Sequence, residues 1–274
     1  MNQTLSIVGL QKTFERGQAL EKQVLKQVSL TLAPGEFISV IGSNGAGKST
    51  LINCIAGAVT ADNGTIRLDG EDITKKRTDL RAKDVARVFQ DPKLGTAGHL
   101  SVEENLAIAD RRGQKNRFKR GVHGSDLARF REKLAVLDLG LESRLHAPAD
   151  TLSGGQRQAL TLIMATMQRP KLLLLDEHTA ALDPKASMMV MQLTEQLVRE
   201  MKQTTMMITH NMENAIRYGD RLIMLHDGEI VIDVRGEAKK RLTVAELVDR
   251  FRHATGDAVV SDRQVLSGEA LAAM

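Results

Sequence analysis

A glycine-rich segment beginning at Gly42 has the residue types and the spacing that bind a triphosphate. It reads Gly42-Ser-Asn-Gly-Ala-Gly-Lys-Ser49 and follows the short apolar run Phe37–Ile41. Glycines let the backbone wrap with its N–H groups inward, and the start of the next helix adds partial positive charge. Lys48 would reach the β- and γ-phosphates, and Ser49 would be a ligand of Mg²⁺. A turn that merely caps a helix is disfavoured by the complete motif. We therefore expect these residues to bind a nucleoside triphosphate: Ser43, Asn44, Gly45, Ala46, Gly47, Lys48, Ser49 and Thr50.

Two acidic residues end a second apolar run, Lys171-Leu-Leu-Leu-Leu-Asp-Glu177. Continuous leucine is typical of a central parallel strand covered on both faces, and ligands bind at the carboxyl ends of such strands. Asp176 would hold Mg²⁺ through water, and Glu177 would polarise the water that attacks the γ-phosphate. The alternative is an acidic pair that caps the next helix, which is less favoured because the phosphate loop is also present.

A third motif is Thr151-Leu-Ser-Gly-Gly-Gln-Arg-Gln158. Ser153, the backbone amides that follow it and the helix dipole would form a second anion site. This stretch resembles the signature sequence Leu-Ser-Gly-Gly-Gln of the ATP-binding cassette family. The match to that family runs from about residue 5 to about residue 235, in the order phosphate loop, Gln90, signature, Leu175-Asp-Glu177, Ala181-Leu-Asp183 and His210.

The resemblance implies further roles, beginning with a catalytic set of Glu177, His210 and Gln90. Gln90 would touch Mg²⁺ or the attacking water, so the implied metal site comprises Ser49, Gln90 and Asp176. His210 would be the switch histidine on the γ-phosphate, although a lone histidine after a strand is more often structural. The signature of one subunit would complete the ATP site of a second copy through Ser153, Gly154, Gly155 and Gln156, with Asp183 communicating between the copies. Asp183 before a proline is also a plain helix-start signal.

Two positions depart from the family pattern. Phe14 stands where a tyrosine more often stacks on adenine. Since stacking needs only a π-face, Phe14 should serve, but a buried core phenylalanine is the open alternative. His178 follows Glu177 where proline is usual. We interpret His178 as a local variation that leaves the catalytic pair in place.

Composition limits the class of protein. The 274 residues are 42% hydrophobic and 26% charged, which is ordinary for a soluble globular chain, and Cys54 alone cannot form an internal disulfide. No run approaches ~18 apolar residues, and the first residues lack a secretory signal, so we expect a cytoplasmic protein. The net charge of +4 permits attraction to nucleic acid or to an anionic membrane without choosing between them.

The expected fold is an α/β P-loop core with a mainly parallel sheet, a small antiparallel β lobe and an inserted helical subdomain. The lobe would contain strands at Leu5–Leu10 and Val28–Leu32. Apolar residues three and four apart predict helices in Val102–Ala109 and Leu127–Leu137 of the insertion. A single ATPase domain would then span 1–250, with its core in 1–90 and 151–240, the insertion in 91–150 and a short tail in 251–274.

A basic segment lies inside the insertion. Arg111–Arg120 has six basic residues and no acidic one. A solvated loop and contact with anionic lipid headgroups are both open interpretations. Nucleic acid is a lesser alternative because Phe118 alone offers a stacking face there.

The resemblance implies the ATPase subunit of an importer, peripheral on the inner face of the cell membrane. The motifs look most like a bacterial subgroup that works with a branched-chain-amino-acid-like permease and a solute-binding protein. The expected partners are a second copy, a transmembrane permease docked near Leu94–Ala109 and that binding protein, with no nucleic acid. The cargo would be an amino acid or similar small solute. A non-transport cassette of the iron–sulfur assembly type and an exporter subunit are the alternatives.

Overall fold

Two sheets form the framework of the computed structural model, which describes residues 3–15, 17, 20–114 and 124–255. The larger sheet has the order β10-β9-β3-β8-β7-β6, and β10 alone runs antiparallel to its neighbour. Its strands are β3 (Phe37–Gly42), β6 (Val85–Val88), β7 (Leu172–Asp176), β8 (Thr205–Ile208), β9 (Arg221–His226) and β10 (Glu229–Arg235).

The smaller sheet is antiparallel and has the order β2-β1-β4-β5. Its strands are β1 (Leu5–Phe14), β2 (Lys22–Leu32), β4 (Asn63–Leu68) and β5 (Glu71–Asp72). The expected α/β core with a small antiparallel lobe is therefore confirmed. Both β1 and β2 are longer than predicted, and the added part of β2 includes Leu25, which is fully buried in the core beneath the small sheet.

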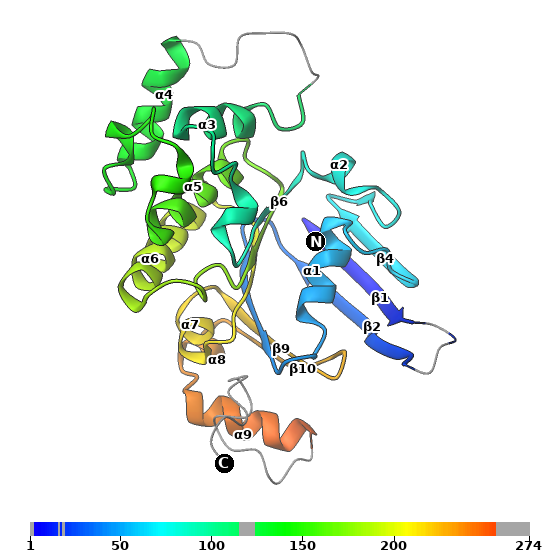
Figure 1. Cartoon of the computed structure of the whole chain (residues 1–274). Coiled ribbons are helices and arrows are strands. Elements are labelled where there is room, and N and C mark those ends of the chain that lie inside the picture. Colours follow the sequence, from blue (N-terminus) through cyan, green and yellow to red (C-terminus); the bar gives the residue numbers. More distant parts are fainter. Residues whose placement is uncertain (1–2, 16, 18–19, 115–123, 256–274) are drawn as a thin grey trace.

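The central strands are buried because both faces of the larger sheet are covered (Figure 1). Leu172 and Leu174 of β7 pack into the same core as α1 (Lys48–Ala56) and the small sheet. Leu173 and Leu175 point the other way, into a core shared with α5 (Gly154–Thr166) and α6 (Pro184–Met201). This arrangement explains the uninterrupted leucine run and fixes Asp176 at the end of the strand.

The remaining helices are α2 (Thr78–Arg81), α3 (Val102–Asp110), α4 (Gly124–Ala135), α7 (Met212–Arg217), α8 (Glu237–Lys240) and α9 (Val244–Thr255). The helices expected around 102–109 and 127–137 correspond to α3 and α4. Helix α9, which was not predicted from the sequence, packs Leu247, Val248 and Phe251 into a third apolar core. Because α9 continues to Thr255, a tail beginning at residue 251 would start inside a helix. Residues 256–274 and most of the basic segment lie outside the described residues.

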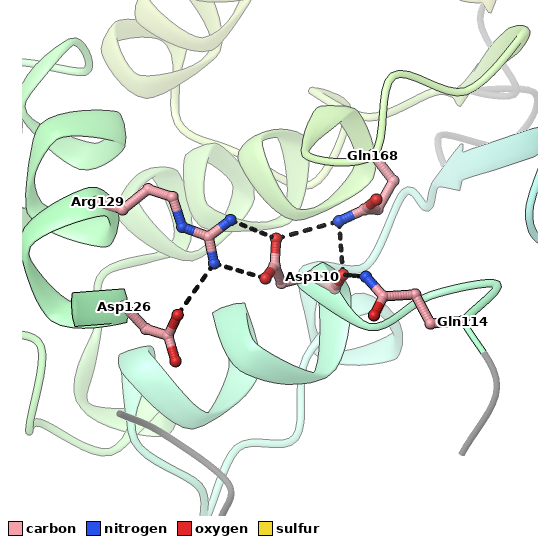
Figure 2. A network of polar contacts seen from close by, with 5 residues as sticks. All are labelled: Asp110, Gln114, Asp126, Arg129 and Gln168. Atoms are coloured by element: carbon pink, nitrogen blue, oxygen red, sulfur yellow. Dashed lines mark hydrogen bonds and ion pairs between the residues drawn. The ribbon is translucent and has the colours of Figure 1, made fainter. Parts of the chain in front are cut away.

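A polar network joins the ends of α3 and α5 to α4 (Figure 2). Arg129 of α4 donates from both terminal nitrogens to Asp110, at 3.0 and 2.6 Å, and contacts Asp126 at 3.3 Å. Gln168 and Gln114 each donate to the backbone oxygen of Asp110, and Gln168 also donates to its carboxylate. The bidentate pair fixes the helices more firmly than a single ion pair would.

In the part of the chain that the structure describes, no helix is long and apolar enough to cross a membrane.

Candidate functional site

The phosphate loop connects β3 to α1 and requires glycine at two positions. At Gly42, where φ is +154°, a Cβ would lie 2.2 Å from the carbonyl oxygen of Leu225. At Gly47, where φ is +102°, it would lie 2.7 Å from the carbonyl oxygen of Val24. A side chain at either position would therefore displace a strand. The loop borders a cavity of about 200 Å³ lined by Lys22, Val24, Asn44, Gly45, Ala46, Gly47, Lys48, Ser49, Thr50 and Glu177.

Lys48 lies across this loop and is nearly buried, with 6% of its surface exposed. Its Nζ donates to the carbonyl oxygens of Gly42 at 2.6 Å and Ser43 at 3.0 Å. Burial lowers the pKa of Lys48, and the nearby carboxylates of Glu177 and Asp176 oppose that shift. The ammonium is thus held at the cavity wall, where a phosphate oxygen can replace a backbone carbonyl as its partner.

The acids predicted from the sequence lie at the carboxyl end of β7. Parallel pairing sets Asp176 opposite Ile208 of β8, and the amide of Glu177 donates to the Ile208 carbonyl at 3.0 Å. Glu177 adopts φ +47°, which is uncommon for a residue with a side chain. This turn directs Glu177 into the cavity of the phosphate loop, so the structure brings these two predicted motifs together.

His210 follows β8 and meets Glu177, with 3.5 Å between His210 Nδ1 and Glu177 Oε2. The hydrogen bond between them is the main cause of a lowered pKa for Glu177 and a raised pKa for His210. A second cavity, of about 180 Å³, opens beside this pair. Its lining comprises Glu177, Thr179, Ala180, Leu182, Pro184, Ser187, Thr209, His210, Asn211 and Asn214.

Arg87 contacts the site but was not identified from the sequence. Its Nη2 lies 2.5 Å from Asp176 Oδ2, and its Nη1 donates to Asn53 Oδ1 at 2.7 Å. The available signal was a single cation within the otherwise apolar strand Val85–Val88. A cation facing a core usually has a buried anionic partner, which the sequence alone did not locate.

The donor chemistry of the predicted metal residues fits Mg²⁺. Ser49 offers a hydroxyl and Asp176 a carboxylate, which are hard oxygen donors of the kind Mg²⁺ takes alongside substrate phosphates and water. Ser49 lines the phosphate cavity, and Asp176 lies close enough to Lys48 to perturb its pKa. Gln90 is exposed two residues beyond β6, whose Val88 pairs with Leu175, so it lies at the same edge of the sheet.

The signature forms the start of α5. Ser153 Oγ accepts from the amide of Gln156 at 3.2 Å, and the Gln156 side chain accepts from the Ser153 amide at 3.2 Å. This capping box orients the first turn. A Cβ on Gly155 would lie 3.0 Å from Ala186 of α6. Among the described residues, the lining of the phosphate-loop cavity includes none from the signature, so the two motifs of one chain present separate surfaces.

Asp183 and His178 both stabilise the segment between β7 and α6. Asp183 caps α6, with Oδ1 accepting from the Ala186 amide at 3.0 Å. His178 is buried and lies 3.0 Å from Thr194 Oγ1 of α6, and burial lowers the pKa of His178 to about 4. His178 therefore anchors the turn after Glu177 as a neutral side chain.

Phe14 is 39% exposed at the end of β1, so the alternative of a buried core phenylalanine is wrong. It pairs with Lys22, which lines the phosphate cavity, and Lys12 Nζ lies 5.4 Å from its ring centroid. An exposed ring beside that cavity has the accessibility that stacking on a base requires.

Comparison with known proteins identifies relatives of the whole chain. A family model described as ABC transporter matches residues 25–180. A tyrosine transport ATP-binding protein of Clostridioides difficile is 45% identical over 91% of this chain and 99% of its own length. A phosphonates import ATP-binding protein of Alcaligenes faecalis is 37% identical over 84% of this chain and 82% of its own. A dimeric post-hydrolysis state of an ATP-binding cassette bound to ADP and Pi superposes with a TM-score of 0.71, at 28% identity over 84% of this chain and 98% of that one.

Proposed function

Because the chain belongs to the ABC transporter family and is an ATP-hydrolysing cassette, we propose that it powers a membrane importer of a small solute, an amino acid or a close analogue. The relative from C. difficile, whose name specifies tyrosine transport and which aligns over nearly the full length of both chains, carries this proposal. The name of the relative from A. faecalis specifies phosphonate import, which supports the importer class and sets the competing cargo.

The proposed mechanism of ATP hydrolysis depends on residues at the ends of β3, β7 and β8. ATP occupies the phosphate-loop cavity, with Phe14 against adenine and Lys48 on the β- and γ-phosphates. Glu177 orients a water and accepts its proton as the water oxygen bonds to the γ-phosphorus and the bond to the β-bridging oxygen breaks. His210, whose Nδ1 lies 3.5 Å from Glu177 Oε2, holds that carboxylate in place and contacts the γ-phosphate.

Ser49, Asp176 and Gln90 would hold Mg²⁺, which would supply charge neutralisation when bound. The residues fit that ion through their oxygen donors.

The working assembly that we propose contains two copies of this chain. The signature residues of one copy cover the nucleotide held by the other, and Asp183 lies next to that contact. Separate surfaces for the phosphate loop and the signature within one chain support this arrangement. ATP would favour the closed pair and hydrolysis would release it, which is the two-state element that performs work.

A transmembrane permease would hold this pair at the inner face of the membrane, with a solute-binding protein delivering the cargo. Leu94 and Ile108 are 69% and 57% exposed in the region predicted to dock. Exposed large apolar side chains of this kind are suited to burial against a partner.

Uptake assays test the proposal directly. Cells that express the chain with its neighbouring permease should accumulate radiolabelled tyrosine in a manner that unlabelled amino acids, and not phosphonates, suppress. Cells with Glu177→Gln in the chain are the matched control and should show only background uptake. If phosphonates, and not amino acids, suppress the uptake, the proposed cargo is wrong. If the cells transport the label outward, the complex is an exporter and not an importer.

A further inference from the structure

Arg87 is fixed between the phosphate-loop helix and the end of β7. Its guanidinium contacts Asp176 at 2.5 Å and Asn53 at 2.7 Å, and lies 4.7 Å from the ring centroid of Phe89. The side chains of Arg87 and Asp176 are only 17% and 16% exposed. Solvent therefore screens this ion pair weakly.

The position of Arg87 relates it to the predicted metal residues. Asn53, which accepts from Arg87, lies one helical turn beyond Ser49 on α1, so the guanidinium contacts the helix that carries the hydroxyl expected to bind Mg²⁺. In register, Arg87 pairs with Leu174, which shares a sheet face with Asp176 two residues later. The guanidinium thus approaches the Asp176 carboxylate from the adjoining strand and donates a hydrogen bond to one of its two oxygens, Oδ2.

We propose that Arg87 is a positioning residue that weakens Mg²⁺ binding by sharing the charge of Asp176. The inference rests on the proposed function, in which Asp176 serves the metal. An arginine on that carboxylate has two opposite effects. It orients the oxygens, which favours the metal, and it cancels negative charge, which disfavours it.

The charge effect should dominate because Asp176 acts through a water molecule. A contact through water tolerates small changes in carboxylate direction, whereas a unit charge at the separation of neighbouring side chains alters the affinity for a divalent ion by about tenfold or more even at the dielectric constant of bulk water, about 80. A weaker Mg²⁺ site would let ADP leave more readily after hydrolysis, since the metal and the nucleotide bind together.

The test is an Mn²⁺ titration of the full chain with ADP, followed by electron paramagnetic resonance of free Mn²⁺, which substitutes for Mg²⁺ at oxygen sites. Arg87→Met and Arg87→Gln should each lower the half-saturating Mn²⁺ at least fivefold. Arg87→Lys, which keeps the charge, should stay within about twofold of the unmodified chain. Arg77→Met removes an equal charge from a side chain that is 82% exposed and should change nothing.

Nucleotide binding in EDTA, measured with a fluorescent ADP analogue, checks that each variant is folded. If Arg87→Met does not fold, Arg87→Gln, which keeps a donor for Asn53, decides the question. Unchanged or weaker Mn²⁺ binding in the folded neutral variant overturns the proposal. Asp176→Asn distinguishes failure of the proposed function from failure of this inference. If Asp176→Asn leaves Mn²⁺ binding unaltered, the metal role of Asp176 is wrong. If Asp176→Asn weakens Mn²⁺ binding but the Arg87 variants do not change it, only the inference about Arg87 is wrong.

Discussion

Glu177 is the residue on which the proposed chemistry depends most directly. It lines both cavities and is hydrogen-bonded by His210, and its lowered pKa keeps it ionised as a proton acceptor. Glu177→Gln keeps the size of the side chain but removes the base, so ATP binding should persist while turnover falls by ~10²- to 10⁴-fold. Phosphate release and equilibrium nucleotide binding measure the two quantities. The exposed Glu213→Gln on α7 is the control, and full turnover in Glu177→Gln would remove Glu177 from its assigned role.

Adding a single methyl group at Gly47 tests the geometry of the phosphate loop. Gly47→Ala places Cβ 2.7 Å from the Val24 carbonyl oxygen at φ +102°. Relief requires movement of β2 or of the loop, so the affinity for ATP should fall at least tenfold, the equivalent of about 1.4 kcal/mol. Isothermal titration measures it. The control is Gly70→Ala, because Gly70 also has positive φ but a Cβ there would meet no heavy atom within 4 Å. Equal loss in both variants would attribute the effect to backbone strain instead of the contact with β2.

At the scale of elements, α1 depends on a cation that another helix supplies. The last turn of α1 has no basic residue, and Arg81 of α2 donates to the carbonyl oxygens of Cys54 at 2.7 Å and Ile55 at 2.8 Å. It also donates to those of Thr74 and Lys76 and is 3% exposed. The positive charge compensates the negative end of the helix dipole.

Arg81→Met should therefore lower the free energy of unfolding by about 3 kcal/mol, because four carbonyl oxygens lose a charged donor in a buried site. Urea unfolding measures the loss. Arg77→Met, four residues earlier and exposed, should change stability by less than about 0.5 kcal/mol. A similar small change for Arg81 would show that water replaces its donors at no cost.

The hairpin of β9 and β10 is joined to the small sheet by Arg221, which is 5% exposed. Arg221 donates to both oxygens of Asp233, at 2.7 and 2.5 Å, and to the Thr31 carbonyl oxygen at 2.8 Å. The hydrogen bond from Arg221 is the main cause of the lowered pKa of Asp233.

Because the folded-state pKa is depressed, this stabilisation is fully present above the ordinary value of 3.8 and is lost as pH falls through the lower folded value. Asp233→Asn should cost about 2 kcal/mol at pH 7, and the difference from the unmodified chain should shrink below about pH 4. Guanidinium unfolding at several pH values gives the curve. A cost that does not vary down to pH 3 would assign it to packing instead of charge.

These elements also indicate what sequence reasoning can find. The phosphate loop, the leucine run and the signature are contiguous, so the residues that determine each motif are adjacent in the chain. Asp176 lies 89 residues from Arg87, and Cys54 lies 27 residues from Arg81, so no periodic pattern in the local sequence predicts either contact. Similarly, α9 has a clear apolar face in Leu247, Val248 and Phe251, but its polar neighbours and the small residues after it concealed the helix.

At the scale of the whole molecule, the separation of the phosphate loop from the signature predicts that each active site forms between two copies. Ser153→Asp tests this because aspartate is as good a helix N-cap as serine, so α5 should fold, while its charge would repel the nucleotide of the other copy. Alone, this variant and Glu177→Gln should each be nearly inactive.

Mixed before ATP is added, the two variants should recover activity. In a mixed pair, one site carries both defects and the other site carries neither. At the intact site, the Ser153→Asp chain holds the nucleotide and supplies an unmodified Glu177. The Glu177→Gln chain covers that nucleotide with an unmodified Ser153. Random pairing of equal amounts makes half of the dimers mixed, so roughly a quarter of full turnover should return if the sites act independently. Phosphate release over a series of mixing ratios should peak at equal amounts. A straight line between the two inactive variants would mean that each chain hydrolyses ATP with its own signature, or through a pairing in which the signature takes no part.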